Sequence, residues 1–180
     1  MIYFHARIEQ MIEPQLLIDN INRIGIHFLV DQSYSESTIT LTPAEILAGL
    51  AAQSDARMRL ALIVVLLQRS DFAESAYQAL ALMDEPDKLT FKLYYTAAHY
   101  LQVIYTNQLG DVLGSYETLP DYFSEELKIE KHNSATDQLL QLAESHKEIT
   151  GIPLNWYGTY NYAAERVISR LNKEKAWITV

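Results

Sequence analysis

The chain has 180 residues, of which 49% are hydrophobic and 21% charged, so it is long enough to bury one core and too short for two comfortable domains. It contains no cysteine, which excludes a disulfide framework, a thiolate metal site and a thiol nucleophile. Its formal charge of −9 repels phosphate backbones and attracts basic partners, so nucleic acid is not an expected ligand. We predict one mainly α-helical domain, a helical bundle over residues 1–180, with a helical core at 43–180.

Residues 1–42 fit either a strand or a helix. Alternation as in a strand is seen at Ile2, Phe4, Ala6 and Ile8. One helical face, however, would hold Phe4, Ile8, Met11 and Ile12. From Pro14 the spacing is helical up to Gly25. Residues 26–30 and 38–41 then fit two short strands around a serine-rich turn. The sequence leaves open whether this segment holds a small sheet.

Helical signals are clear from Thr42 onward. Thr42 is followed by a proline and then by Glu45 at the third helical position, which is the pattern of a capping box. The helix either continues to Arg69 or breaks near Asp55, where a second capping residue stands. Residues 60–67 are uninterrupted apolar side chains, which predicts a segment buried on all sides.

Four further helices are predicted. One opens at Ser70, and the segment 88–109 forms a central helix so apolar that only a narrow polar stripe remains. The other two begin at the capping residues Ser134 and Asn155, and the first of them ends at Gly151. Between them and the central helix, residues 110–133 are expected to be irregular.

The polar stripe of the central helix is the first candidate site. Lys92, Thr96 and His99 recur along one face, and Tyr95 flanks them. A solvated surface is one interpretation, because any central helix presents some face to water. A small-molecule-binding or enzymatic pocket is the alternative, and a concave, partly dry cavity around His99 would indicate it.

The irregular segment 110–133 is the second candidate site. It places Tyr116, Tyr122 and Phe123 among acidic residues, and residues 111–150 carry nine acids against three bases, a charge of −6. Exposed aromatic rings among charges are typical of protein contacts. We therefore predict that these three rings bind another protein, one of basic charge. The alternative is that the rings anchor the segment in the core.

Motifs for catalysis and cofactor binding are missing from the sequence. There is no Gly-x-Ser-x-Gly elbow, no glycine-rich phosphate loop and no His-x-x-x-His pair. We therefore predict no catalytic residue, no metal and no cofactor, and we favour a non-enzymatic protein. His146 falls on an apolar helix face, as a hydrogen-bonded core histidine does. A short basic tail is the one local exception to the acidic charge: Arg166, Arg170, Lys173 and Lys175.

Targeting signals are also missing. The N-terminus lacks the basic start and long apolar core of a signal peptide, and no apolar run approaches the roughly 20 residues of a membrane span. We expect a cytoplasmic protein without a membrane partner, which folds alone or as a homo-oligomer.

Three segments carry a resemblance to a group of known proteins. They are residues 42–47 (TPAEIL), 55–62 (DARMRLAL) and 93–98 (LYYTAA). Together they resemble uncharacterised helical bacterial proteins that occur beside small nucleotidyltransferase-type proteins, over roughly residues 42–125. The resemblance rests on patterns and transfers no functional residue. It implies an accessory or antidote-like protein that binds another polypeptide.

Overall fold

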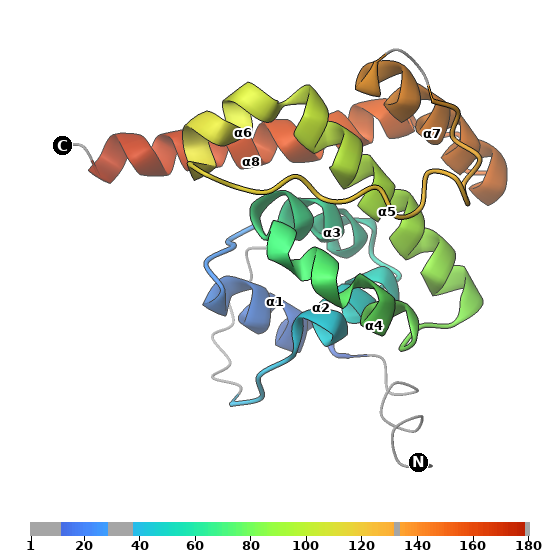
Figure 1. Cartoon of the computed structure of the whole chain (residues 1–180). Coiled ribbons are helices and arrows are strands. Elements are labelled where there is room, and N and C mark those ends of the chain that lie inside the picture. The colour runs from blue at the N-terminus through green and yellow to red at the C-terminus, as the bar shows by residue number, and fades with distance from the viewer. Residues whose placement is uncertain (1–11, 29–37, 132–133, 179–180) are drawn as a thin grey trace.

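The computed structural model describes residues 12–28, 38–131 and 134–178, and within them the fold is mainly α-helical, as the sequence predicts (Figure 1). All eight helices described contribute to one buried hydrophobic cluster. The elements are α1 (Pro14–Arg23), α2 (Pro43–Ala51), α3 (Ala56–Gln68), the 3-10 helix η2 (Ser70–Ser75), α4 (Ala76–Leu80), α5 (Glu85–Ile104), α6 (Thr106–Leu113), α7 (Ala135–Thr150) and α8 (Trp156–Ile178).

Within residues 12–28 and 38–42, the chain is helical at α1 and irregular elsewhere. Gly25, with a φ of +85°, ends the helix in a conformation that glycine adopts readily. Residues 26–28 and 38–41 form no strand. The backbone of the second of these segments has another partner, because the Asn20 side chain donates to the Ile39 carbonyl at 3.1 Å and accepts from the Leu41 N–H at 2.9 Å. The remaining residues of the ambiguous segment, 1–11 and 29–37, lie outside the described ranges.

The helix that begins after Thr42 does not continue to Arg69. It breaks before Asp55, which gives the separate helices α2 and α3. α2 begins with the predicted capping box, in which Thr42 accepts the N–H of Glu45 and the Glu45 carboxylate accepts the N–H of Thr42. It ends before Asp55, whose carboxylate accepts two backbone N–H groups in the first turn of α3. The apolar run 60–67 is buried throughout, as predicted, because α2, α5 and α8 all pack against α3.

The central helix is shorter than its apolar pattern predicts. α5 ends at Ile104 and the chain bends before α6, so the single helix expected over 88–109 is wrong. The Thr106 hydroxyl donates to the carbonyls of Gln102 and Val103, a bond within one turn that bends helices. The apolar period nevertheless continues through the bend, because Leu109 is buried.

The irregular connection also starts later than predicted. Gly110 lies inside α6, and the helix ends at Gly114, which has a φ of +79°. From there, residues 114–131, which we call the strap, run across α5 toward α7 without a helix or strand (Figure 1).

α7 has the predicted start and end, and α8 has the predicted start. Ser134 accepts the N–H of Asp137 at the start of α7, and Gly151 ends it in the left-handed conformation. The Asn155 side chain accepts the N–H of Gly158 in the first turn of α8.

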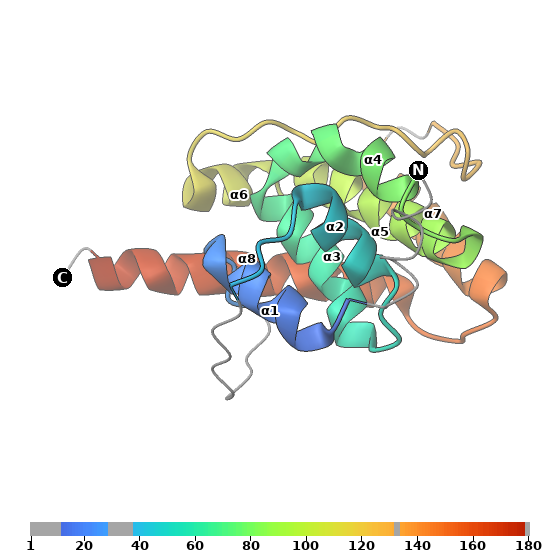
Figure 2. The ribbon, with the colours of Figure 1, turned by 90° about the horizontal axis from the view of Figure 1, so that it is seen from below.

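The helices form two groups joined by α5. In Figure 1, α6, α7 and α8 lie above α1 to α4, and α5 runs diagonally between the groups. α5 packs against α2, α3, α7 and α8. Figure 2 shows the strap along one side of the molecule and α8 along the other.

The predicted core histidine lies where α5, α7 and α8 meet. His146 is buried, its ring stacks on Trp156 with centroids 3.5 Å apart, and its Nδ1 accepts the Tyr160 hydroxyl. Burial lowers the pKa of His146 to about 4, since desolvation penalises the imidazolium, and Arg59 adds a smaller repulsion.

This buried histidine predicts a loss of stability in mild acid. The unfolded chain takes up a proton near pH 6.5, whereas the folded chain resists it until about pH 4. Stability present above pH 6.5 should therefore fall by up to about 3 kcal/mol as the pH drops to 4. Urea unfolding of wild type and His146→Gln at each pH measures the effect. The stability difference between the two should shrink in acid, and a constant difference would contradict the assignment.

Candidate functional site

The two candidate sites lie against each other, because the strap covers the polar stripe of α5. The Tyr95 hydroxyl donates to the Pro120 carbonyl at 3.1 Å, and His99 Nδ1 lies 2.7 Å from the Leu119 carbonyl, to which it donates. Gln102, one turn further along the same face, accepts the Leu119 N–H at 2.7 Å. Side chains of α5 thus satisfy the backbone groups of an irregular segment, as buried backbone requires.

The other two residues of the polar stripe are also not free at the surface: one forms an ion pair with the strap, and the other is buried. Lys92 forms an ion pair with Glu126 of the strap. Thr96 is buried, and its hydroxyl has no hydrogen-bond partner among the described residues. Burial raises the pKa of the Tyr95 phenol above its usual range, with a further contribution from Tyr122, so this hydroxyl stays protonated.

The aromatic residues of the strap divide into one buried ring and one partly exposed ring. Phe123 is only 2% exposed and meets Tyr95 edge-on, with centroids 5.1 Å apart. Tyr122 is 36% exposed and stacks on Tyr95 at 5.7 Å. The structure therefore places Phe123 as an anchor of the strap, and it places Tyr122 at the surface.

The third predicted ring, Tyr116, is partly buried. It packs against the core, and its hydroxyl reaches the Gln102 carbonyl at 3.5 Å. Ser124 ties the middle of the strap to α5 in addition, because its hydroxyl shares a hydrogen bond with the Tyr100 hydroxyl at 2.5 Å.

The sequence pattern does not single out Tyr77, which completes the exposed part of this face. Tyr77 is 60% exposed on α4, and its ring lies 5.2 Å from that of Tyr122. We call these two rings the tyrosine pair. A signal was present, because Tyr77 lies off the apolar face of its own helix. The same helical spacing could have added Gln102 to the stripe, three residues after His99.

The segment that carries Tyr122 is acidic. The strap and the last turn of α6, residues 111–131, carry six acids and two lysines, a charge of −4. All six acids are exposed: Asp111, Glu117, Asp121, Glu125, Glu126 and Glu130. The tyrosine pair is thus joined to an acidic segment of the chain, whose exposed carboxylates we call the acidic rim.

Within residues 12–28, 38–131 and 134–178, no three His, Asp or Glu side chains converge as metal ligands would. Over the same ranges, no helix combines the length and apolarity that crossing a bilayer requires.

Comparisons with known proteins add no relative. The chain matches no model of a protein family, no curated protein and no solved structure.

Proposed function

We propose that this protein is a non-enzymatic accessory protein that binds a basic protein partner through the tyrosine pair. The observation that carries the proposal is the contact between Tyr77 and Tyr122, two large exposed rings from distant parts of the chain. Tyrosine anchors interfaces well, because it buries a large rigid surface and keeps a hydroxyl for hydrogen bonding. The acidic rim favours a partner of opposite charge.

The architecture of the strap supports this function over an enzymatic one. A ligand that used Tyr95 and His99 would have to displace the strap, since both side chains already bond to its carbonyls. The same bonds hold Tyr122 in place before a partner arrives, which lowers the entropy lost on binding. The resemblance to helical proteins found beside nucleotidyltransferase-type proteins agrees with an antidote-like role.

Site-directed crosslinking tests the proposal. A photoreactive phenylalanine analogue is placed at position 77, at position 122 or, as a control, at Tyr162, an exposed tyrosine of α8. Crosslinking in native lysate, followed by mass spectrometry, should identify one basic protein captured from positions 77 and 122 and not from 162. Capture of different proteins at 77 and 122, or of the same protein at all three positions, would count against the proposal.

Affinity for the purified partner then provides the quantitative prediction. Tyr77→Ala should weaken the complex by about tenfold or more, whereas Tyr162→Ala leaves it unchanged. Added salt should weaken the wild-type complex, because the acidic rim contributes through screened charges. The melting temperature of each variant is the control for folding. If the folded Tyr77→Ala variant binds the partner with the same affinity as wild type, the interface does not include Tyr77.

A further inference from the structure

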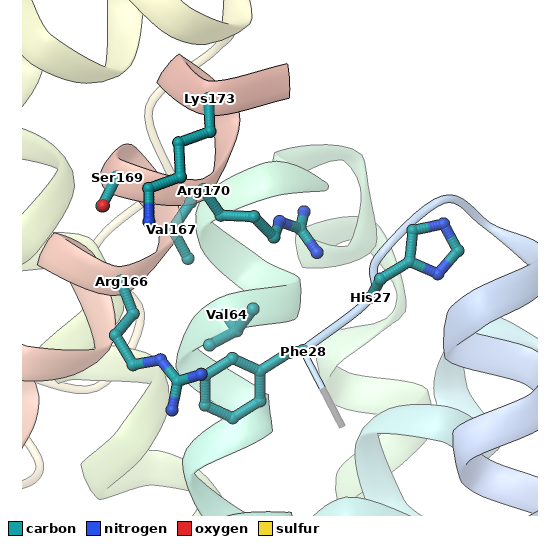
Figure 3. A pocket seen from close by; sticks show the side chains of 8 residues that line it. All are labelled: His27, Phe28, Val64, Arg166, Val167, Ser169, Arg170 and Lys173. Atoms are coloured by element: carbon teal, nitrogen blue, oxygen red, sulfur yellow. The ribbon is translucent and has the colours of Figure 1, made fainter. Parts of the chain in front are cut away.

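A second surface feature lies away from the strap, where α8 faces α3 and the segment after α1. It is a partly open cavity of about 240 Å³ (Figure 3). Its apolar walls are Val64 of α3, Val167 of α8 and the ring of Phe28. The polar walls come mainly from α8, and His27 completes them on the opposite side.

Three cations of α8 line this cavity in an otherwise acidic protein. Arg166, Arg170 and Lys173 are spaced at i, i+4 and i+7, so they share one helical face. Like charges at such spacing repel each other. Only one ion pair relieves them among the described residues, that of Arg170 Nε with Glu174 Oε1 at 3.4 Å. The cavity therefore keeps an excess of positive charge.

The guanidinium of Arg170 uses only some of its N–H donors within the described residues. Its Nη2 donates to the Gln68 side chain at 2.8 Å, which fixes the guanidinium. Its Nε and Nη1 are buried and have no hydrogen-bond partner among the described residues, since the contact with Glu174 lies outside hydrogen-bond geometry. Buried donors of this kind are unfavourable unless an acceptor reaches them.

Among the described residues, aromatic side chains and no carboxylate hold Arg166 in place. Its guanidinium carbon lies 5.3 Å from the centre of the Phe28 ring, and its Nη1 donates to the Tyr162 hydroxyl at 3.2 Å. Rings of this kind orient a guanidinium without neutralising it. Figure 3 shows Arg166 and Arg170 reaching from α8 toward the segment that carries Phe28.

We propose that this cavity binds the phosphate or pyrophosphate group of a small phosphorylated molecule. Two guanidinium groups and an ammonium are the groups that proteins use to bind such multiply charged oxyanions. Ligand cavities commonly enclose roughly 300–1,000 Å³, so this smaller one suits a compact ligand. A nucleic acid fits less well, because the chain carries −9 and the cations are confined to a cavity instead of following an extended track.

Titration with pyrophosphate tests the proposal on the full chain. Isothermal calorimetry and melting temperature are measured at constant ionic strength, with sodium chloride in the reference solution. Wild type should bind pyrophosphate at one saturable site and melt at a higher temperature. The arginine Nε resonance of Arg170 should move during the titration, which locates the anion. The absence of saturable binding would overturn the proposal.

A matched pair of variants separates a specific site from general charge. Arg166→Gln with Lys173→Gln should weaken pyrophosphate binding by about tenfold or more, while Arg170 and its contact with Gln68 remain. Arg57→Gln with Lys147→Gln removes the same charge from exposed positions outside the cavity, and should bind as wild type does. Equal weakening in both pairs would overturn the proposal, as would binding of a short single-stranded RNA that pyrophosphate does not displace.

Discussion

Replacing Leu62 with aspartate is expected to destabilise the fold severely. Leu62 is completely buried in α3, and α2, α5 and α8 enclose that helix. An aspartate there would lose its hydration without gaining a partner, at a cost of more than about 4 kcal/mol. Small domains have only about 5–15 kcal/mol of stability in total, so a loss of this size removes a large part of it.

Far-UV circular dichroism and urea unfolding measure the result. Val103→Asp provides the control, because it also introduces an aspartate at an apolar helical position, but at an exposed one. The control should lose about 1 kcal/mol or less, mainly through helix propensity. A Leu62→Asp variant that melts at the wild-type temperature would contradict the buried position of α3.

Replacing Phe123 with alanine is expected to release the strap while the helices stay folded. The ring is nearly completely buried and contacts both Phe91 and Tyr95. Loss of such a ring from a packed core costs about 3–5 kcal/mol. Once the anchor is gone, the bonds from Tyr95 and His99 to the strap carbonyls have no apolar contact to exclude water from them.

Amide hydrogen exchange over residues 114–131, measured beside urea unfolding, follows the release. Exchange should accelerate there by more than it does in α3. Tyr122→Ala is the comparison, and it should lose less stability because its ring is partly exposed. Equal stability of Phe123→Ala and wild type would mean that the strap is held by its polar contacts alone.

Local chemistry in the sequence predicts the helix ends well. Thr42, Asp55 and Ser134 each bind backbone groups within three residues, and Gly151 adopts a conformation that it reaches without strain. Such signals need no knowledge of distant residues. The end of α5 was missed for the opposite reason: Leu109 continues the apolar period on α6, so hydrophobic spacing alone does not reveal the bend.

The candidate sites depended on contacts that the sequence does not encode locally. The stripe residues Tyr95 and His99 were recognised as polar groups on an apolar helix, but the segment that occupies them lies about 20 residues away. The basic spacing on α8 was also visible. The other wall of the cavity, at Phe28, could not be predicted, because nothing in the sequence around Phe28 indicates contact with α8.

The strap and α8 lie on different sides of the molecule and carry opposite net charges, so these two segments together contribute an electric dipole (Figure 2). The negative end is the strap, and the positive end is α8, which carries four basic residues against two acidic ones. In the field of a charged partner the molecule experiences a torque before any contact forms, and that torque turns the strap toward a basic surface. The turning acts over distances comparable to the Debye length, about 8 Å at physiological ionic strength. Two proteins that approach in random orientations would thus meet more often with the tyrosine pair between them.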